Sequence, residues 1–165
     1  MNNAPRKIAF YALLTALGLI LSYVEMLLAL PSPVPGAKIG LANLVTMFAL
    51  VLLGVPSAAA VSLLRVLLSG ILFGNFLAAL YSLAGCFLSL LVMAILRKTG
   101  KFGIAAVSAM GGAAHNTGQL LCAVWLAGPA AALYFPYLFI AGIVSGIVIG
   151  ILGGIIVKRL RGVIQ

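Results

Sequence analysis

Six long apolar segments constrain this chain more than any other feature. A helix needs about 20 residues to cross the hydrocarbon core of a bilayer, and only the second segment is clearly shorter than that. Lipid cannot satisfy an exposed strand edge, and the alternating polar positions of a small barrel are missing from the sequence. We therefore predict an all-α polytopic membrane protein, a six-transmembrane-helix bundle forming one integral membrane domain over residues 1–165. The segments cover roughly 8–30, 39–54, 57–74, 77–96, 103–127 and 132–157.

Composition supports the same class. Hydrophobic residues make up 65% of the chain and charged residues 7%, with a mean hydropathy of +1.32. Ordinary soluble domains carry about 25% charged residues. No water-soluble fold could bury this much apolar surface, so the lipid bilayer is the expected environment.

The net charge of +9 reflects topology and not nucleic-acid binding. Eight of the ten basic residues fall at ends of apolar segments that six crossings would place on one side. Positive residues favour the cytoplasmic side, so we expect both the N- and C-termini in the cytoplasm. The three basic clusters are Arg6 and Lys7; Arg97, Lys98 and Lys101; and Lys158, Arg159 and Arg161.

Ionisable side chains inside a span are costly and mark functional sites. Helical rise places Glu25 about 25 Å from the cytoplasmic entry, Arg65 about 12 Å into the third segment and His115 about 18 Å into the fifth. Lys38 begins the second segment on the outer side, with Asn43 about one turn below it. These side chains therefore fall at mid-depth or in the outer half.

Helical spacing gathers the polar residues into stripes. His115 and Gln119 are four residues apart, and Asn116 and Gln119 three, which predicts one shared face. The third segment carries a stripe of Ser62, Arg65 and Ser69, and the first carries a stripe of Gly18, Ser22 and Glu25. We expect these stripes to enclose an outward-facing, water-accessible ligand cavity. The predicted ligand-binding residues are Glu25, Lys38, Asn43, Arg65, His115, Asn116 and Gln119.

Structural roles compete with ligand binding for five of these residues. Arg65 and Glu25 could form a purely structural ion pair. Lys38 could extend its ammonium to the interface, His115 could hydrogen-bond between helices, and Asn43 could cap a helix.

The residue inventory argues against an enzyme. Glu25 is the only acidic residue, so the several carboxylates that usually hold a magnesium diphosphate are missing, as is a glycosidase pair. One histidine without a nearby cysteine cannot form a zinc site, and there is no Walker loop. We predict no catalytic residues, metal or cofactor, and a cavity whose positive balance favours an anionic ligand.

Small residues form two further strips. Ala9, Ala12 and Ala16 lie opposite the polar stripe of the first segment, where another helix could approach closely. The last segment carries glycines at four-residue spacing, which we interpret as packing within the bundle. They are Gly142, Gly146, Gly150 and Gly154.

Three motifs resemble those of the Gx transporter family, also labelled heptaprenyl diphosphate synthase component I. They are "PVPGAKIGLANLVT" (33–46), "LLRVLLSGILFG" (63–74) and "AHNTGQLL" (114–121). That family is similar to the S-components of energy-coupling factor (ECF) transporters, six-helix proteins of prokaryotic plasma membranes that capture small molecules from outside. The resemblance implies docking of Ala12 and Ala16 on a transmembrane coupling subunit with two ATPases, and closure of residues 31–38 over the ligand.

Three functions remain open at this stage. The first is substrate capture for an ECF importer, with an isoprenoid-related precursor as one candidate ligand. The second is a non-catalytic membrane component I of heptaprenyl diphosphate synthase. The third is a solitary carrier or a membrane scaffold.

Overall fold

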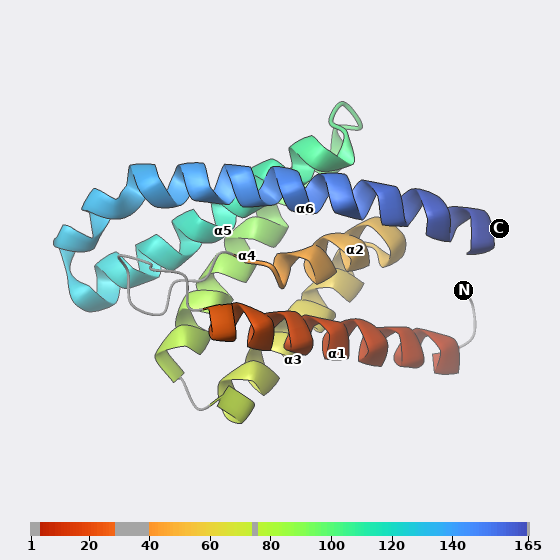
Figure 1. The fold of residues 1–165 in the computed structure, drawn as a ribbon, viewed down its shortest axis with the longest axis horizontal. Coiled ribbons are helices and arrows are strands. Elements are labelled where there is room, and N and C mark those ends of the chain that lie inside the picture. Colours follow the sequence, from red (N-terminus) through yellow and green to blue (C-terminus); the bar gives the residue numbers. More distant parts are fainter. Residues whose placement is uncertain (1–3, 29–39, 74–75, 165) are drawn as a thin grey trace.

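The chain folds into six α-helices and one 3-10 helix in a computed structural model that describes residues 4–28, 40–73 and 76–164 (Figure 1). No strand occurs in these ranges, which confirms the prediction of an all-α fold with six helices. The elements are α1 Ala4–Leu28, α2 Asn43–Leu53, α3 Val55–Phe73, α4 Phe76–Lys98, α5 Ile104–Ala127, η1 Pro129–Tyr134 and α6 Phe135–Ile164. The largest boundary difference is in α6, which continues past the predicted end at residue 157 and through the last basic cluster.

Four of the described helices are long and apolar enough to cross a membrane, where the sequence predicted six. They are α1, α3, α4 and α6, the last counted together with η1. Only about a third of each apolar stretch is buried inside the protein: 28% in α1, 39% in α3, and 33% in both α4 and α6. Large apolar side chains such as Leu13, Phe87 and Val144 point outward instead. This inside-out distribution is typical of a multi-pass membrane protein.

Two helices are not candidate spans: α2 is short, and α5 is enclosed by other helices. The α2 helix has 11 residues and is about 16 Å long, half the thickness of the hydrocarbon core. The α5 helix has 24 residues, but its His115, Asn116 and Gln119 lower its hydropathy. Because α5 packs between α4 and α6 and is buried along most of its length, it does not need a uniformly apolar surface.

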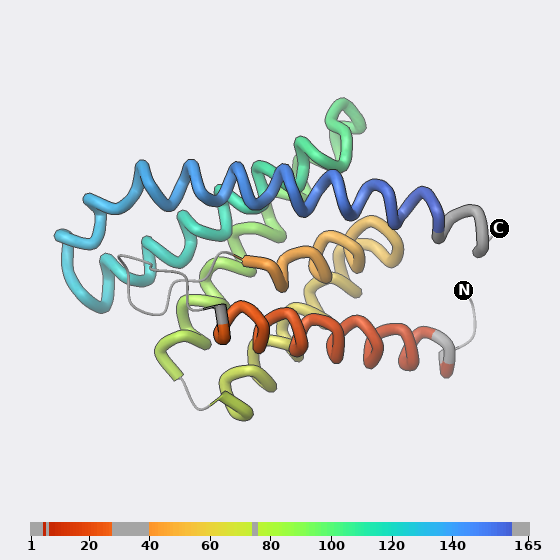
Figure 2. Tube along the Cα trace, in the orientation of Figure 1, coloured from red at the N-terminus to blue at the C-terminus, as the bar shows by residue number. Residues whose placement is uncertain are grey.

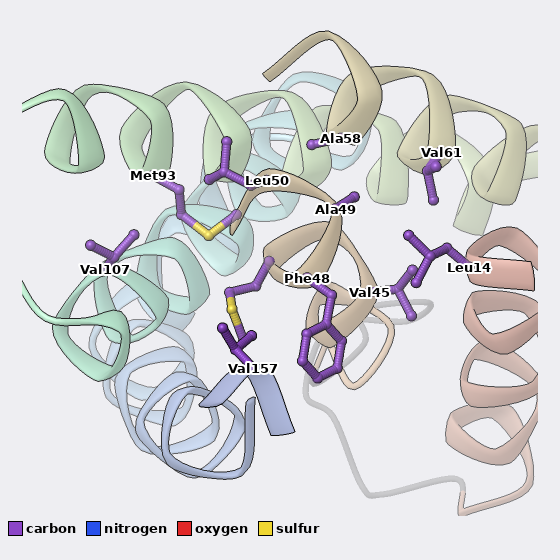
Figure 3. Close-up of a cluster of buried hydrophobic side chains, with 11 residues drawn as sticks. Leu14, Val45, Phe48, Ala49, Leu50, Ala58, Val61, Met93, Val107 and Val157 are labelled. Carbon is purple, nitrogen blue, oxygen red and sulfur yellow. The ribbon is translucent and has the colours of Figure 1, made fainter. Parts of the chain in front are cut away.

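The short α2 helix lies at the centre of the apolar core (Figure 3). Five side chains of α2 belong to this core. Each of the other five α-helices contributes one or two residues that pack around them. A helix whose side chains are apolar apart from Asn43 and Thr46 is expected to be enclosed in this way. The core cluster consists of Leu14, Val45, Met47, Phe48, Ala49, Leu50, Ala58, Val61, Met93, Val107 and Val157.

Glycines allow α5 and α6 to pack with their backbones in contact. A Cβ atom added to Gly142 would lie 2.5 Å from the carbonyl oxygen of Gly112 in α5. Gly146 and Gly150 face the backbones of Ser108 and Ala105 just as closely. The packing role predicted for the glycine strip is therefore confirmed at these three positions of α6. It is wrong for Gly154, where an added Cβ would meet nothing within 4 Å.

The start of α1 and the end of α6 lie at the same end of the bundle (Figure 2). The Tyr11 hydroxyl of α1 lies 2.6 Å from the Ser57 hydroxyl, which places the beginning of α3 beside the beginning of α1. Arg97, near the end of α4, donates a 2.8 Å hydrogen bond to the carbonyl of Val51 at the end of α2. The basic helix ends thus gather on one side, as the topology prediction requires.

Candidate functional site

Arg65 is the central charged residue of the interior. Its side chain is 3% exposed and reaches from α3 toward α1 and α4. Nη1 donates to the Ser22 hydroxyl at 3.2 Å, and Nη2 donates to the Cys86 sulfur at 2.8 Å. Both partners are neutral, and Nε has no hydrogen-bond partner among the described residues. The guanidinium charge is therefore buried without a counter-ion in the described part of the chain.

Gly18 makes room for the Arg65 side chain on the face of α1. A Cβ atom at this position would lie 2.7 Å from Arg65 Cδ and 3.2 Å from Cγ. The stripe of Gly18, Ser22 and Glu25 therefore faces the interior of the bundle, as the helical spacing predicted. The glycine accepts the stem of Arg65, and the serine accepts a hydrogen bond from its head.

Glu25 binds the backbone just before α2. One of its carboxylate oxygens accepts a short hydrogen bond from the amide nitrogen of Gly40. Gly40 has φ +92°, a conformation that favours glycine. Glu25 and Arg65 form no ion pair within the described ranges, so the structural bridge considered between them is not what holds Arg65.

His115 lies close to two glycines of other segments. A Cβ atom at Gly85 in α4 would approach the imidazole to 2.8 Å, and one at Gly40 would lie 3.4 Å from its Cδ2 atom. Gln119, one turn further along α5, places its amide nitrogen 3.0 Å from His115 Nε2. The predicted pairing of His115 with Gln119 on one helix face is thus present, and both side chains are buried.

The α4 helix joins these contacts into one polar cluster. Gly85 lies against His115, and the next residue, Cys86, receives the hydrogen bond from Arg65. One turn further along α4, Ser89 accepts a 3.1 Å hydrogen bond from the Asn43 amide. Asn43 therefore bonds across to α4 and makes no side-chain cap for α2.

One predicted site residue, Asn116, faces away from this cluster. Asn116 turns toward α6, where its amide nitrogen donates a 2.7 Å hydrogen bond to the carbonyl of Leu138. Adjacent residues of a helix are about 100° apart, so Asn116 faces a different neighbour from that of His115. Lys38 and the predicted closing segment 31–38 lie outside the described residues.

Several cluster residues were missed by the sequence analysis. Cys86 and Ser89 lie on α4 with Ser82, and the three form a buried stripe at helical spacing. This pattern of 82, 86 and 89 was a usable signal. The signal is weak, because a cysteine within an apolar segment is equally typical of ordinary packing.

The chemistry of the cluster is that of hydrogen bonding and charge. Its groups are hydrogen-bond donors and acceptors around one guanidinium and one carboxylate. Over the described ranges, no three histidine, cysteine or acidic side chains lie together in a way that could hold a metal ion. The arrangement is suited to holding a small polar or anionic group.

The opposite face of α1 is uncovered. Ala9, Ala12 and Ala16 are all exposed, while Gly18 and Ser22 on the other side are buried. Within the chain, α1 packs on α3 and α2. The two-faced character predicted for this helix is therefore present.

Comparison with known families places the chain. The sequence profile described as Heptaprenyl diphosphate synthase component I matches residues 14–156, which is most of the sequence. The chain belongs to the heptaprenyl diphosphate synthase component I family. The match spans α1 through α6 and includes all the described cluster residues. Among curated proteins and solved structures, no significant match is found.

Gly85→Ala in this family member should displace His115 and destabilise the protein by about 1–3 kcal/mol, the usual cost of overpacking. The added methyl group would meet two ring atoms and the backbone oxygen of His115, each within 2.9 Å. Thermal unfolding of the detergent-purified protein measures the loss. A second change, His115→Ala, should restore part of it, because the ring accounts for two of the three contacts.

The matched control for this prediction is Gly103→Ala at the start of α5. A Cβ atom there meets nothing within 4 Å, so the unfolding midpoint should not fall. Equal behaviour of the two alanine variants would show that the imidazole does not lie against Gly85.

Proposed function

We propose that the chain is a substrate-capture subunit, resembling an S-component, of an ECF-type importer. Its ligand is a small anion, with an isoprenoid-related precursor as one candidate. The observation that carries this proposal is the burial of Arg65 beside neutral partners only. A buried charge without a counter-ion is unfavourable in a bilayer, and an anionic ligand would neutralise it.

The position of the cluster supports capture from outside the cell. Glu25 lies about 27 Å along α1 from Lys7, so it is near the end of the helix that is remote from the basic clusters. The positive-inside rule assigns the basic end to the cytoplasm of a prokaryotic plasma membrane. Arg65 and Glu25 would then be approached from the opposite, extracellular side.

The family description favours a second candidate function, a non-catalytic membrane component of heptaprenyl diphosphate synthesis. Glu25 is the only acidic residue of the chain, which argues against a catalytic role of its own in that synthesis. This alternative predicts that deleting the gene changes quinone side-chain length or synthase activity in membranes. Importer function predicts no such change when the synthase subunit is intact.

The uncovered face of α1 gives the proposed function its direct test. The double variant Ala12→Trp and Ala16→Trp should prevent docking on a transmembrane coupling subunit, because bulky rings keep another helix from approaching closely. Co-purification of a coupling subunit and its ATPases with the tagged full chain measures docking. We expect wild type to retain these partners and the variant to lose them at least tenfold.

The matched control is Ala59→Trp with Ala106→Trp, two exposed alanines on α3 and α5. These changes should leave docking intact. If the α1 variant keeps its partners as well as the control does, or if wild type retains no coupling subunit, the importer assignment is contradicted.

A further inference from the structure

We infer that the connection between α5 and α6, residues 125–137 with η1 at its centre, lies flat in the lipid headgroup layer of the membrane. This connection is at the end of the bundle farthest from the start of α1 and the end of α6 (Figure 1). The inference concerns the surface that meets the lipid, so it stands whether or not the chain serves an importer.

The side chains of the connection are apolar and uncovered. The η1 sequence is PAAALY, and none of its residues is buried. Leu133 is 82% exposed, and Trp125 near the end of α5 is 81% exposed. The other exposed aromatic side chains are Tyr134, Phe135 and Tyr137. Because no Asp, Glu, Lys or Arg occurs between residues 102 and 157, this surface carries no fixed charge that would favour bulk water.

The backbone of the connection is unsuited to the hydrocarbon core. The α5 helix stops before Gly128, which has φ +96°, and η1 begins with Pro129, which has no N–H. The chain therefore leaves the regular α-helical bonding pattern while it is exposed. Lipid-exposed irregular backbone does not occur within hydrocarbon, because its polar groups have no water to bond. The headgroup layer supplies both water for this backbone and apolar contact for the side chains.

The lengths of α5 and α6 place the connection at the same level. Trp125 is 21 positions from Ile104 at the start of α5, and Tyr137 is 21 positions from Lys158 in the basic cluster of α6. Each stretch is about 32 Å long, and the hydrocarbon core is about 30 Å thick. With the basic ends at the cytoplasmic boundary, both aromatic side chains reach the opposite boundary.

The residue types and the neighbouring surface favour lipid over a protein partner. Tryptophan and tyrosine are enriched at membrane interfaces, where the ring meets acyl chains and the N–H or O–H group meets water. The exposed surface continues along α5 and α6 through Leu121, Ile140 and Val144. Since those side chains belong to the lipid-facing surface of the bundle, the connection extends that surface up to the headgroups.

Trp125 is the only tryptophan of the chain, so its fluorescence reports the depth of the connection. The full chain is reconstituted into phosphatidylcholine vesicles whose acyl chains carry bromine either near the glycerol end or near the methyl end. The interface lies about 15 Å from the bilayer centre, so bromine near the glycerol end should quench Trp125 about twofold more strongly than bromine near the methyl end.

The matched control moves the tryptophan to mid-depth, as Phe87→Trp in a Trp125→Phe background. Phe87 is exposed and lies midway along α4, 11 positions from each end, so bromine near the methyl end should quench this variant more strongly. If Trp125 is quenched most from the methyl end, as in the control, the connection lies in hydrocarbon and the inference is overturned. Quenching of Trp125 by neither brominated lipid would overturn it too, because water or another protein chain would then surround the ring.

Discussion

Arg65→Met should stabilise the ligand-free protein while abolishing its ability to retain a ligand. Replacing buried ionic groups with apolar residues of similar volume is often neutral or stabilising by about 1–4 kcal/mol. The Arg65 charge has only the neutral Ser22 and Cys86 as described partners, so the ligand-free protein should gain stability without it. Truncating one member of a buried charge pair costs about 2–5 kcal/mol, which corresponds to about 30-fold to 5,000-fold in affinity.

Two measurements separate the two effects. Thermal unfolding reports the stability of ligand-free protein, and native mass spectrometry detects any small molecule retained through purification. Lys101→Met is the control, since it removes an exposed positive charge in the connection between α4 and α5. Arg65→Met could instead unfold more easily than wild type and leave ligand retention unchanged. That result would mean that Arg65 only stabilises the packing of α3 against α1 and α4, and the binding assignment would be wrong.

Gly142→Leu should cause the largest loss of stability among single changes in α6. Even the first carbon of the new side chain would lie 2.5 Å from the Gly112 oxygen and 2.9 Å from Ala113 Cα. These are backbone atoms of α5, which cannot move aside without separating the two helices. Overpacking costs about 1–3 kcal/mol when side chains can adjust, so a loss of about 3 kcal/mol or more is expected here.

Gly154→Leu provides the comparison within the same helix. Its Cβ atom would meet nothing within 4 Å, and leucine favours a helix over glycine by roughly 0.5–1 kcal/mol. The unfolding midpoint in detergent should fall for Gly142→Leu and hold or rise for Gly154→Leu. Equal midpoints would mean that α5 and α6 do not pack through this glycine strip.

The contrast between these glycines shows how far sequence reasoning extends. Four-residue spacing predicted a packing strip on α6 but could not show where the partner helix begins. Gly150 faces Ala105 at the start of α5, so Gly154 extends beyond the crossing. The four-residue spacing is a property of α6 alone, whereas the number of glycines that contact α5 depends on where α5 begins.

The same distinction applies to the candidate site, where contacts within one helix follow from the sequence and contacts between helices do not. Spacing along single helices placed Gln119 beside His115 and turned Ser22 and Glu25 inward, because those relations depend only on helical geometry. It did not show that Asn116 faces α6 or that Cys86 contacts Arg65. Those contacts depend on which helices are neighbours, and apolar segments of similar composition do not specify their neighbours.

The central position of α2 was likewise hidden in its sequence. The segment is shorter than the other five but is still predicted as one of six crossings, and its mostly apolar sequence does not say which side is buried. Likewise, α5 is predicted as a crossing from its length, although its polar residues are accommodated by burial between α4 and α6.

The central claim is that small anions reach Arg65 from the side opposite the termini, and Cys86 is its direct reporter. A Cys122→Ser background leaves Cys86 as the only thiol, 2.8 Å from the Arg65 guanidinium. Membrane-impermeant methanethiosulfonate reagents, one anionic and one cationic, are applied to the extracellular side of intact cells. The account predicts that the anionic reagent modifies Cys86 faster, and that Arg65→Met removes this preference. A Cys86 that reacts with neither reagent until the protein is unfolded would contradict it.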